Sequence, residues 1–163
     1  GSEMCIRDSV QQFLRNVEWG DVDFLILDLP PGTGDIQLTI VQTAELDGVV
    51  VVTTPQEVAL IDARKAIGLF ERVETPILGV VENMSYFQCP SDGKIYHIFG
   101  EGGGEREAAK LGVPLLGKIP LDMATRSGGD EGRPVALEDP EQNPVSAAFR
   151  QVAERCAQVV LNR

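Results

Sequence analysis

Four short apolar runs, separated by segments of helical periodicity, constrain the fold of this 163-residue chain more than any other feature. Short runs that are apolar on both faces are typical of strands buried inside a sheet. A helix between successive strands makes the pair parallel, with a right-handed crossover. The pattern therefore predicts an α/β fold, with a mostly parallel sheet and helices on both faces. The expected strands are residues 24–27, 49–52, 76–82 and 113–119.

The segments between these runs place apolar residues at the spacing of a helix face. Asp35 is expected to be an N-cap, because an aspartate oxygen can accept from the free N–H groups of a first helical turn. Residues 84–104 are expected to be an irregular insertion, and residues 127–144 a polar loop rich in glycine and proline. The expected helices are residues 10–17, 35–46, 56–75, 105–111 and 145–159.

Charge and composition exclude several classes of partner. The 14 basic and 25 acidic residues give a net charge of −11, which argues against a nucleic-acid groove and against binding to an anionic membrane. No apolar stretch is long enough to span a bilayer. Three widely spaced cysteines do not form a disulfide framework, so a reducing, cytoplasmic setting is expected.

Residues 1–9 are interpreted separately from the rest of the chain. They lack the basic-then-apolar pattern of a secretory leader. We expect them to be a tag or a sequence artefact, in which case Cys5 has no role. The chain would then be the downstream part of a longer protein.

An aspartate follows the first apolar run at Asp28. In P-loop nucleotidases an aspartate at the carboxyl end of a strand holds Mg²⁺ beside the nucleotide phosphates. Pro30 stiffens the next turn, and Gly32 and Gly34 let backbone N–H groups approach a phosphate closely. The alternative is that residues 28–35 are only a rigid connection between a strand and a helix.

Two other glycine-containing segments are poor candidates for a phosphate loop. Residues 112–118 satisfy G-x-x-x-x-G-K, but Ile119 follows, and it has no hydroxyl for Mg²⁺. We expect this segment to be a core strand. Residues 100–105 precede a helix, but their flanking glutamates would repel phosphate, so a flexible turn is expected.

Four motifs in order carry a specific resemblance. They are Asp28-Leu-Pro-Pro-Gly-Thr-Gly-Asp35, Val52-Thr-Thr-Pro-Gln-Glu57, Glu82-Asn-Met-Ser-Tyr-Phe87 and Pro114-Leu-Leu-Gly-Lys-Ile-Pro-Leu-Asp122. Together they resemble the Mrp-type iron–sulfur cluster carrier ATPases, which are relatives of MinD and ParA with a deviant-Walker P-loop fold. The resemblance runs from about Val10 to Arg163. It implies a homodimer that binds ATP, Mg²⁺ and a [4Fe–4S] cluster and passes the cluster to apo iron–sulfur proteins.

The resemblance assigns roles to individual positions. Asp28 corresponds to the Walker B residue that organises Mg²⁺, and residues 28–35 to the switch segment that senses the γ-phosphate. Catalytic roles are thus implied for Asp28 and Asp35, and nucleotide binding for Asp28, Pro30, Gly32, Gly34 and Asn83.

Asn83 corresponds to the residue that contacts the nucleotide base, since an amide can donate to and accept from a purine edge. Its alternative role is a strand-end residue that bonds its own backbone. Asp62 is expected to be a solvated helix residue.

Cys89 is the candidate cluster ligand. The family loop usually reads Cys-Pro-x-Cys, so that two chains supply the four thiolates of a [4Fe–4S] cluster. Here Asp92 stands in place of the second cysteine, and its oxygens match iron–sulfur chemistry poorly. Cys156 shares the apolar stripe of the last helix and is expected in the core. His97 is expected to be a packed loop residue.

The family's Walker A loop, with its two lysines, has no counterpart in residues 10–163, which correspond to the C-terminal two-thirds of one P-loop domain. Because that loop starts from a central strand, its loss predicts a gap in the sheet. This chain is expected to be unable to hydrolyse ATP, although its parent does. The alternative function is a MinD- or ParA-like switch that binds protein partners without a cluster.

Overall fold

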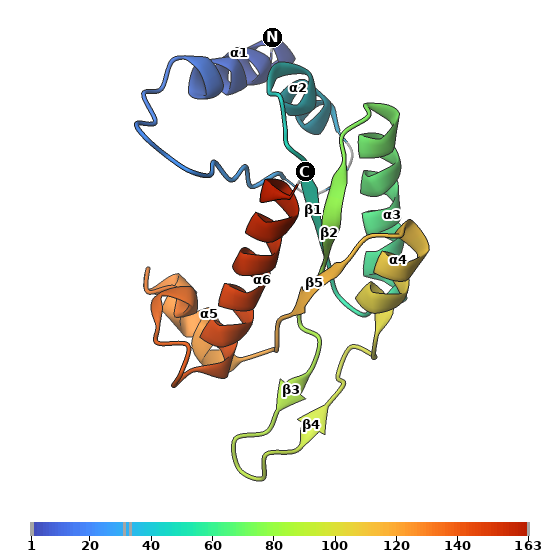
Figure 1. The fold of residues 1–163 in the computed structure, drawn as a ribbon, viewed down its shortest axis with the longest axis vertical. Helices are drawn as coiled ribbons and strands as arrows, with labels where there is room; N and C mark the ends of the chain where they lie inside the picture. The colour runs from blue at the N-terminus through green and yellow to red at the C-terminus, as the bar shows by residue number, and fades with distance from the viewer. Residues whose placement is uncertain (1, 31, 33, 163) are drawn as a thin grey trace.

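A three-stranded parallel sheet forms the centre of the molecule (Figure 1). The computed structural model describes residues 2–30, 32 and 34–162. The sheet has the order β1-β2-β5, so β2 lies between the two edges. The strands are β1 (Val49–Thr53), β2 (Ile77–Glu82) and β5 (Leu115–Lys118). These three predicted strands and their parallel pairing are confirmed.

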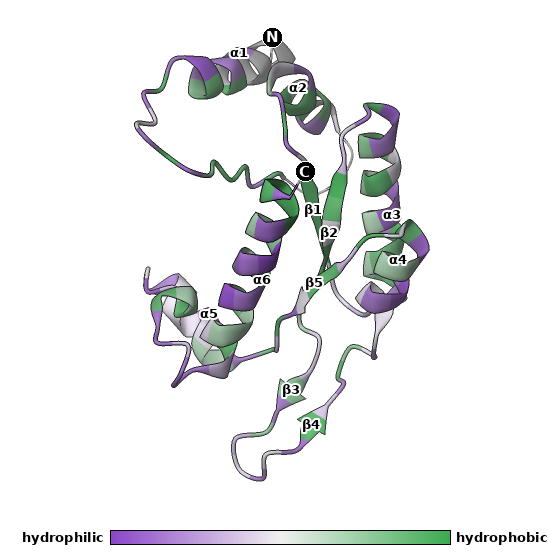
Figure 2. Cartoon of the chain, viewed as in Figure 1, coloured by the Kyte–Doolittle hydropathy of each residue, from purple (hydrophilic) through white to green (hydrophobic). Residues whose placement is uncertain are grey.

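Helices cover both faces of this sheet, as the sequence predicts. On one face α3 (Glu57–Arg72) and α4 (Gly103–Leu111) bury a core in which Val51, Ile67, Val80 and Ala108 take part. On the other face α6 (Pro144–Leu161) packs against a second core. Its buried members are Val81, Leu116 and Ile119. Figure 2 shows hydrophobic residues concentrated along β1 and β2, where both layers meet the sheet.

The remaining helices differ from the expected bounds. The helix α1 spans Ser2–Arg15 and so includes residues 2–9, and α2 spans Asp35–Thr43. Gly34, not Asp35, is the N-cap of α2, so that prediction is wrong by one residue.

Residues 127–144 are only partly a loop. The helix α5 (Met123–Asp130) and the 3-10 turn η1 (Val135–Leu137) occupy part of this segment. The Asp122 carboxylate starts α5 by accepting from the Thr125 N–H at 2.7 Å. This N-cap satisfies a first-turn N–H, and it offsets the poor helix propensity of the glycines in α5.

Residues 84–104 also contain regular structure. The strands β3 (Phe87–Gln88) and β4 (Ile95–Tyr96) pair as an antiparallel hairpin that extends away from the main sheet (Figure 1). The prediction of an irregular insertion is therefore wrong for these residues. Cys89 lies in the turn of this hairpin.

The first predicted strand, residues 24–27, is not a strand. Phe24, Leu25 and Ile26 are exposed in an extended connection, Ile26 at 82%. Within the described part of the chain β1 pairs only with β2, so its other edge has no strand beside it. A buried strand needs a neighbour for its N–H and C=O groups, and residues 24–27 have none. Across the same described residues, no helix is long and apolar enough to cross a membrane.

Candidate functional site

The carboxyl ends of β1 and β2 place Asn83 beside the end of β1. The Asn83 N–H donates to the Thr53 carbonyl at 2.7 Å and so extends the ladder between the strands. The Asn83 Oδ1 accepts from the Met84 N–H at 2.9 Å, where Met84 has a φ of +52°. This hydrogen bond to the local backbone is the alternative role that the sequence analysis gave for Asn83. The carbonyl side of the amide is thus engaged, and no described contact uses its NH₂ group.

Glu82 precedes Asn83 and is fully buried. One carboxylate oxygen accepts from the Ser85 hydroxyl at 2.5 Å, and the other accepts from the Gly104 N–H at 2.6 Å. Gly104 belongs to the first turn of α4, whose free N–H groups form the positive end of the helix. The N-terminus of α4 thus binds an anion that the protein itself supplies.

The two glycines that begin α4 are required by close packing. A Cβ at Gly103 would lie 2.5 Å from the Pro55 carbonyl, and one at Gly104 would lie 2.9 Å from the Glu82 Cβ. The expected flexible turn over residues 100–105 is therefore wrong for these two positions. They allow α4 to approach the ends of β1 and β2.

Thr54 places a buried hydroxyl at the same edge of the sheet. Its Oγ1 has no hydrogen-bond partner among the described residues. A buried hydroxyl without a partner is costly, and a ligand oxygen or nitrogen could satisfy it.

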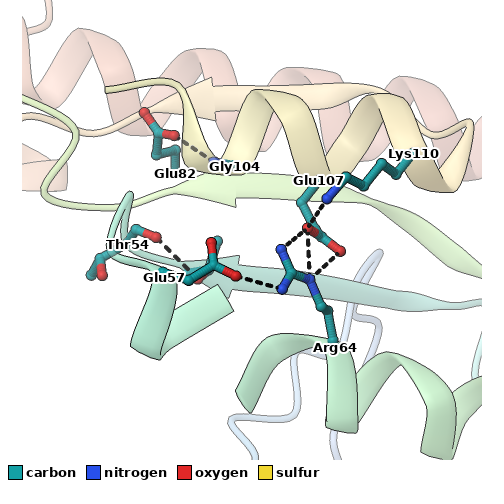
Figure 3. A network of polar contacts seen from close by, with 8 residues as sticks. Thr54, Glu57, Arg64, Glu82, Gly104, Glu107 and Lys110 are labelled. Carbon is teal, nitrogen blue, oxygen red and sulfur yellow. Dashed lines mark hydrogen bonds and ion pairs between the residues drawn. The ribbon is translucent and has the colours of Figure 1, made fainter. Parts of the chain in front are cut away.

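A second buried glutamate connects α4 to α3. Arg64 donates from Nε and Nη2 to both oxygens of Glu107, at 2.8 to 3.0 Å, and from Nη1 to Glu57 at 2.7 Å. The hydrogen bonds from Arg64, aided by its positive charge, lower the pKa of Glu107, and those to Glu107 and Glu57 raise the pKa of Arg64. Figure 3 shows the Glu82 carboxylate pointing to the first turn of α4, whereas Glu107 points to Arg64.

The turn of the β3–β4 hairpin surrounds Cys89 with hydrogen-bond donors. The Cys89 N–H donates to the Lys94 carbonyl at 2.9 Å, and the Gly93 N–H donates to the Cys89 carbonyl at 2.8 Å. The Cys89 Sγ lies 3.0 Å from the Ser91 Oγ. The Ser91 hydroxyl, followed by the N–H groups of Ser91 and Asp92, lowers the pKa of the Cys89 thiol. Such a turn favours the thiolate, which is the form that binds metals.

Asp92 has a structural role in this turn. Its Oδ1 accepts from the Lys94 N–H at 3.0 Å, and this bond is the main cause of the lowered pKa of Asp92. A cleft of about 310 Å³ opens beside the turn. Its lining includes Tyr86, Cys89, Pro120 and Val145.

The segment of residues 28–35 lies apart from these contacts. Asp28 and Gly32 are exposed, and Gly32 has a φ of +98° that a glycine adopts without strain. The Pro30 carbonyl accepts from the Gln37 Nε2 at 2.7 Å, which connects the segment to α2. The Asp35 side chain lies outside the described residues, as do residues 31 and 33. No described contact joins this segment to Asn83 or Cys89.

Other sequence predictions agree with the structure. Residues 115–118 of the apparent phosphate loop form β5, and Asp62 is exposed beside Lys65. Cys156 is half-buried in the α6 core, where burial raises the pKa of its thiol. His97 is the exception, because it is exposed rather than packed, with Nε2 3.6 Å from Glu101. Throughout the described part of the chain, no group of three or more metal-binding side chains forms a cluster.

Sequence reasoning missed Glu82, Thr54 and the close packing of Gly103 and Gly104. A glutamate that ends the apolar run of residues 77–82 was a usable signal, because a charged group inside such a strand requires a partner. The consecutive glycines at the start of α4 were a second signal, since they permit a close backbone approach.

The parallel sheet, the helices on both faces and the polar groups at the strand ends define an α/β nucleotide-binding class of protein. A ParA family model, described as NUBPL iron-transfer P-loop NTPase, matches residues 3–157. The chain therefore belongs to the ParA family of iron-transfer P-loop NTPases.

Individual relatives agree with this assignment. The chain is 49% identical over 150 residues to an iron-sulfur cluster carrier protein of Pyrococcus horikoshii, covering 92% of this chain and 50% of the relative. A nucleotide-binding protein of Archaeoglobus fulgidus, solved in complex with ADP, is 42% identical with a TM-score of 0.72, over 80% of this chain and 54% of that one. The cell division ATPase MinD of Pyrococcus furiosus is 27% identical with a TM-score of 0.66, over 94% and 59%. The chain thus spans about half the length of the relatives it matches.

Proposed function

We propose that this chain is the C-terminal part of a nucleotide-dependent iron–sulfur cluster carrier, with Cys89 as its cluster ligand. The observation that carries the proposal is the Cys89 turn, where hydroxyl and backbone donors stabilise a thiolate on a projecting hairpin. A ligand that must hold a cluster and then release it to another protein has to be accessible, and Cys89 is only half-buried. The name of the Pyrococcus relative supports the same function.

The number of thiolates determines what this cluster site can be. One Cys89 per chain gives a homodimer two thiolates, whereas a [4Fe–4S] cluster is usually held by four. Asp92 is bonded to Lys94 within the turn and adds only a hard oxygen ligand. The cluster is therefore proposed as weakly held cargo shared between two copies, for delivery to apo iron–sulfur proteins.

The nucleotide site is proposed at the carboxyl edge of the sheet. Asn83 would contact the base through its free NH₂ group, and the unpartnered Thr54 hydroxyl at the same edge supports a ligand there. Asp28 would hold Mg²⁺ together with phosphate oxygens, a donor set that this ion accepts. Bound Mg²⁺ would neutralise phosphate charge.

The switch segment would supply the remaining contacts. Pro30, Gly32 and Gly34 would approach the phosphates through the backbone, and Asp35 would act on the attacking water. Residues 10–163 are proposed as two-thirds of one P-loop domain, preceded by a tag or artefact at residues 1–9. Its setting is proposed to be the cytoplasm, with neither nucleic acid nor membrane as partner.

A second candidate function is a MinD-like switch that binds protein partners without a cluster. The observation that favours it is Asp92, which stands where the family loop has its second thiolate.

Anaerobic reconstitution with ferrous iron and sulfide distinguishes the two functions. We expect the wild-type chain to acquire the visible absorbance of a cluster, Cys89→Ser to lose it, and Cys156→Ser to keep it. Cys156 is the matched control because its thiol is half-buried in the α6 core. Equal absorbance in all three proteins, or none in the wild type, would favour the switch.

Hydrolysis provides a separate measurement. We expect this chain to release no phosphate from Mg-ATP above background, because no lysine-containing phosphate loop occurs in its sequence. Turnover similar to that of a full-length relative would contradict the assignment of residues 10–163 to part of a domain.

A further inference from the structure

The turn that carries Asn83 is held by a carboxylate rather than by backbone contacts alone. Glu82 and Ser85 lie on either side of Asn83 and Met84, and the Glu82 carboxylate accepts from the Ser85 hydroxyl at 2.5 Å. The Ser85 N–H donates to the Ile119 carbonyl at 3.0 Å, which fixes the far end of the turn to the segment after β5. The hydrogen bond between the Glu82 and Ser85 side chains therefore closes a ring that contains Asn83 and Met84.

The same carboxylate holds a second element against this turn. Its other oxygen accepts from the Gly104 N–H at 2.6 Å, and the missing side chains of Gly103 and Gly104 allow that approach. Glu82 thus connects the end of β2, the Asn83 turn and the N-terminus of α4. Both of its partners are uncharged donors, and the group is fully buried.

We propose that Glu82 is a positioning residue that fixes the Asn83 amide for recognition of an adenine base. The inference rests on the proposed nucleotide site, and it adds the group that determines where Asn83 lies. The Asn83 N–H is held by the Thr53 carbonyl, but Asn83 is only partly buried and its Oδ1 bonds only the adjacent Met84 N–H, so these contacts hold one end of the turn. The Glu82 carboxylate holds the turn as a whole, because any shift of the turn against β2 or α4 would break a buried hydrogen bond.

Glu107 offers a matched control. It is a second buried glutamate that binds α4 to the rest of the molecule, but its partner is Arg64 on α3 rather than the Asn83 turn. Loss of either carboxylate disturbs the docking of α4. Only loss of Glu82 also removes the carboxylate that holds the Asn83 turn.

The test is an NMR titration of the full ¹⁵N-labelled chain with ADP and, separately, with GDP, extended to millimolar nucleotide so that a weak complex is measured. We expect the wild type to prefer ADP, with the Asn83 side-chain amide among the signals that shift. Glu82→Leu is expected to reduce the ratio of the two affinities about fivefold or more, the effect of one misplaced hydrogen bond. Glu82→Gln should retain the ratio, because its amide can accept from Gly104 and donate to Ser85.

The outcomes separate this inference from the proposed nucleotide site. No shift with either nucleotide at millimolar concentration would overturn both, and equal wild-type affinities for ADP and GDP would overturn the recognition of adenine through Asn83 and Glu82. A wild-type preference that persists in Glu82→Leu, or that falls equally in Glu107→Leu, would overturn the role of Glu82 alone. If Glu82→Leu does not fold, Ser85→Ala decides: a reduced preference supports the proposal, and an unchanged one overturns it.

Discussion

Two apolar runs of four residues each, residues 24–27 and residues 49–52, adopt different structures in this molecule. Residues 49–52 lie in the edge strand β1, in which Val51 is buried, whereas residues 24–27 are a mostly exposed connection. β1 has β2 along one edge and α3 against one face, so the backbone groups on that edge and the Val51 side chain have partners. The earlier run has no strand beside it within the described residues. The comparison shows that an apolar run specifies a strand only where a neighbouring strand is available.

The prediction with the largest expected effect on stability places a charge in each run. Val51→Asp should lower the free energy of unfolding by several kcal/mol, because an unpaired carboxylate would enter the core between β1 and α3. Ile26→Asp should change it by less than about 0.5 kcal/mol, as is usual for an exposed position. Urea unfolding followed by circular dichroism measures both.

An equal loss for the two variants would break the comparison, because it would show that residues 24–27 are buried in solution. The Ile26 variant is the informative one, since its side chain is the most exposed of the run.

A second prediction concerns the ion pair that holds α4 over the sheet. The pKa of Glu107 is lower in the folded than in the unfolded chain, so its contribution is complete above the unfolded value and is lost as pH falls through the folded one. Glu107→Gln should therefore lower the free energy of unfolding at neutral pH by about 1 kcal/mol. The difference from wild type should shrink as the solution is acidified.

Thermal unfolding between neutral and acidic pH checks this prediction. A difference that grows towards acid pH would contradict the sign. Asp62→Asn is the control, because its carboxylate pairs with Lys65 in solvent.

The smallest expected effect lies at the start of α5. Asp122→Ala removes the carboxylate that accepts from Thr125, and should cost about 1 kcal/mol or less, the usual contribution of an N-cap. Hydrogen exchange should become faster in the first turn of α5 and stay unchanged in β2. An unchanged rate in α5 would show that the cap does not hold this helix.

The fold was largely predictable because the strongest signals are local. The valine-rich run at residues 49–52 and the helix stripe of Val152, Cys156 and Val159 could be assigned from spacing alone. The hairpin at residues 87–96 and the helix α5 were not predictable in this way. Each depends on a few backbone and side-chain hydrogen bonds, such as the Asp122 cap. These bonds do not change the spacing of apolar residues along the sequence.

The candidate site was predictable only in part. Asn83 and Cys89 were proposed from motif positions, and the Cys89 turn adds hydroxyl and backbone donors that lower the pKa of its thiol. The dependence of Asn83 on Glu82 was hidden, since the contact with Gly104 joins residues that are 22 positions apart in the chain.

The sequence by itself determined the class of fold, the family and the candidate residues at positions 28, 83 and 89. It did so because strand length, helical spacing and ordered motifs are properties of neighbouring residues. Only the tertiary structure decided which apolar runs are strands and which carboxylates are buried. Those outcomes depend on the partners that a backbone N–H or a charged side chain meets after folding, and such partners lie far apart in the sequence.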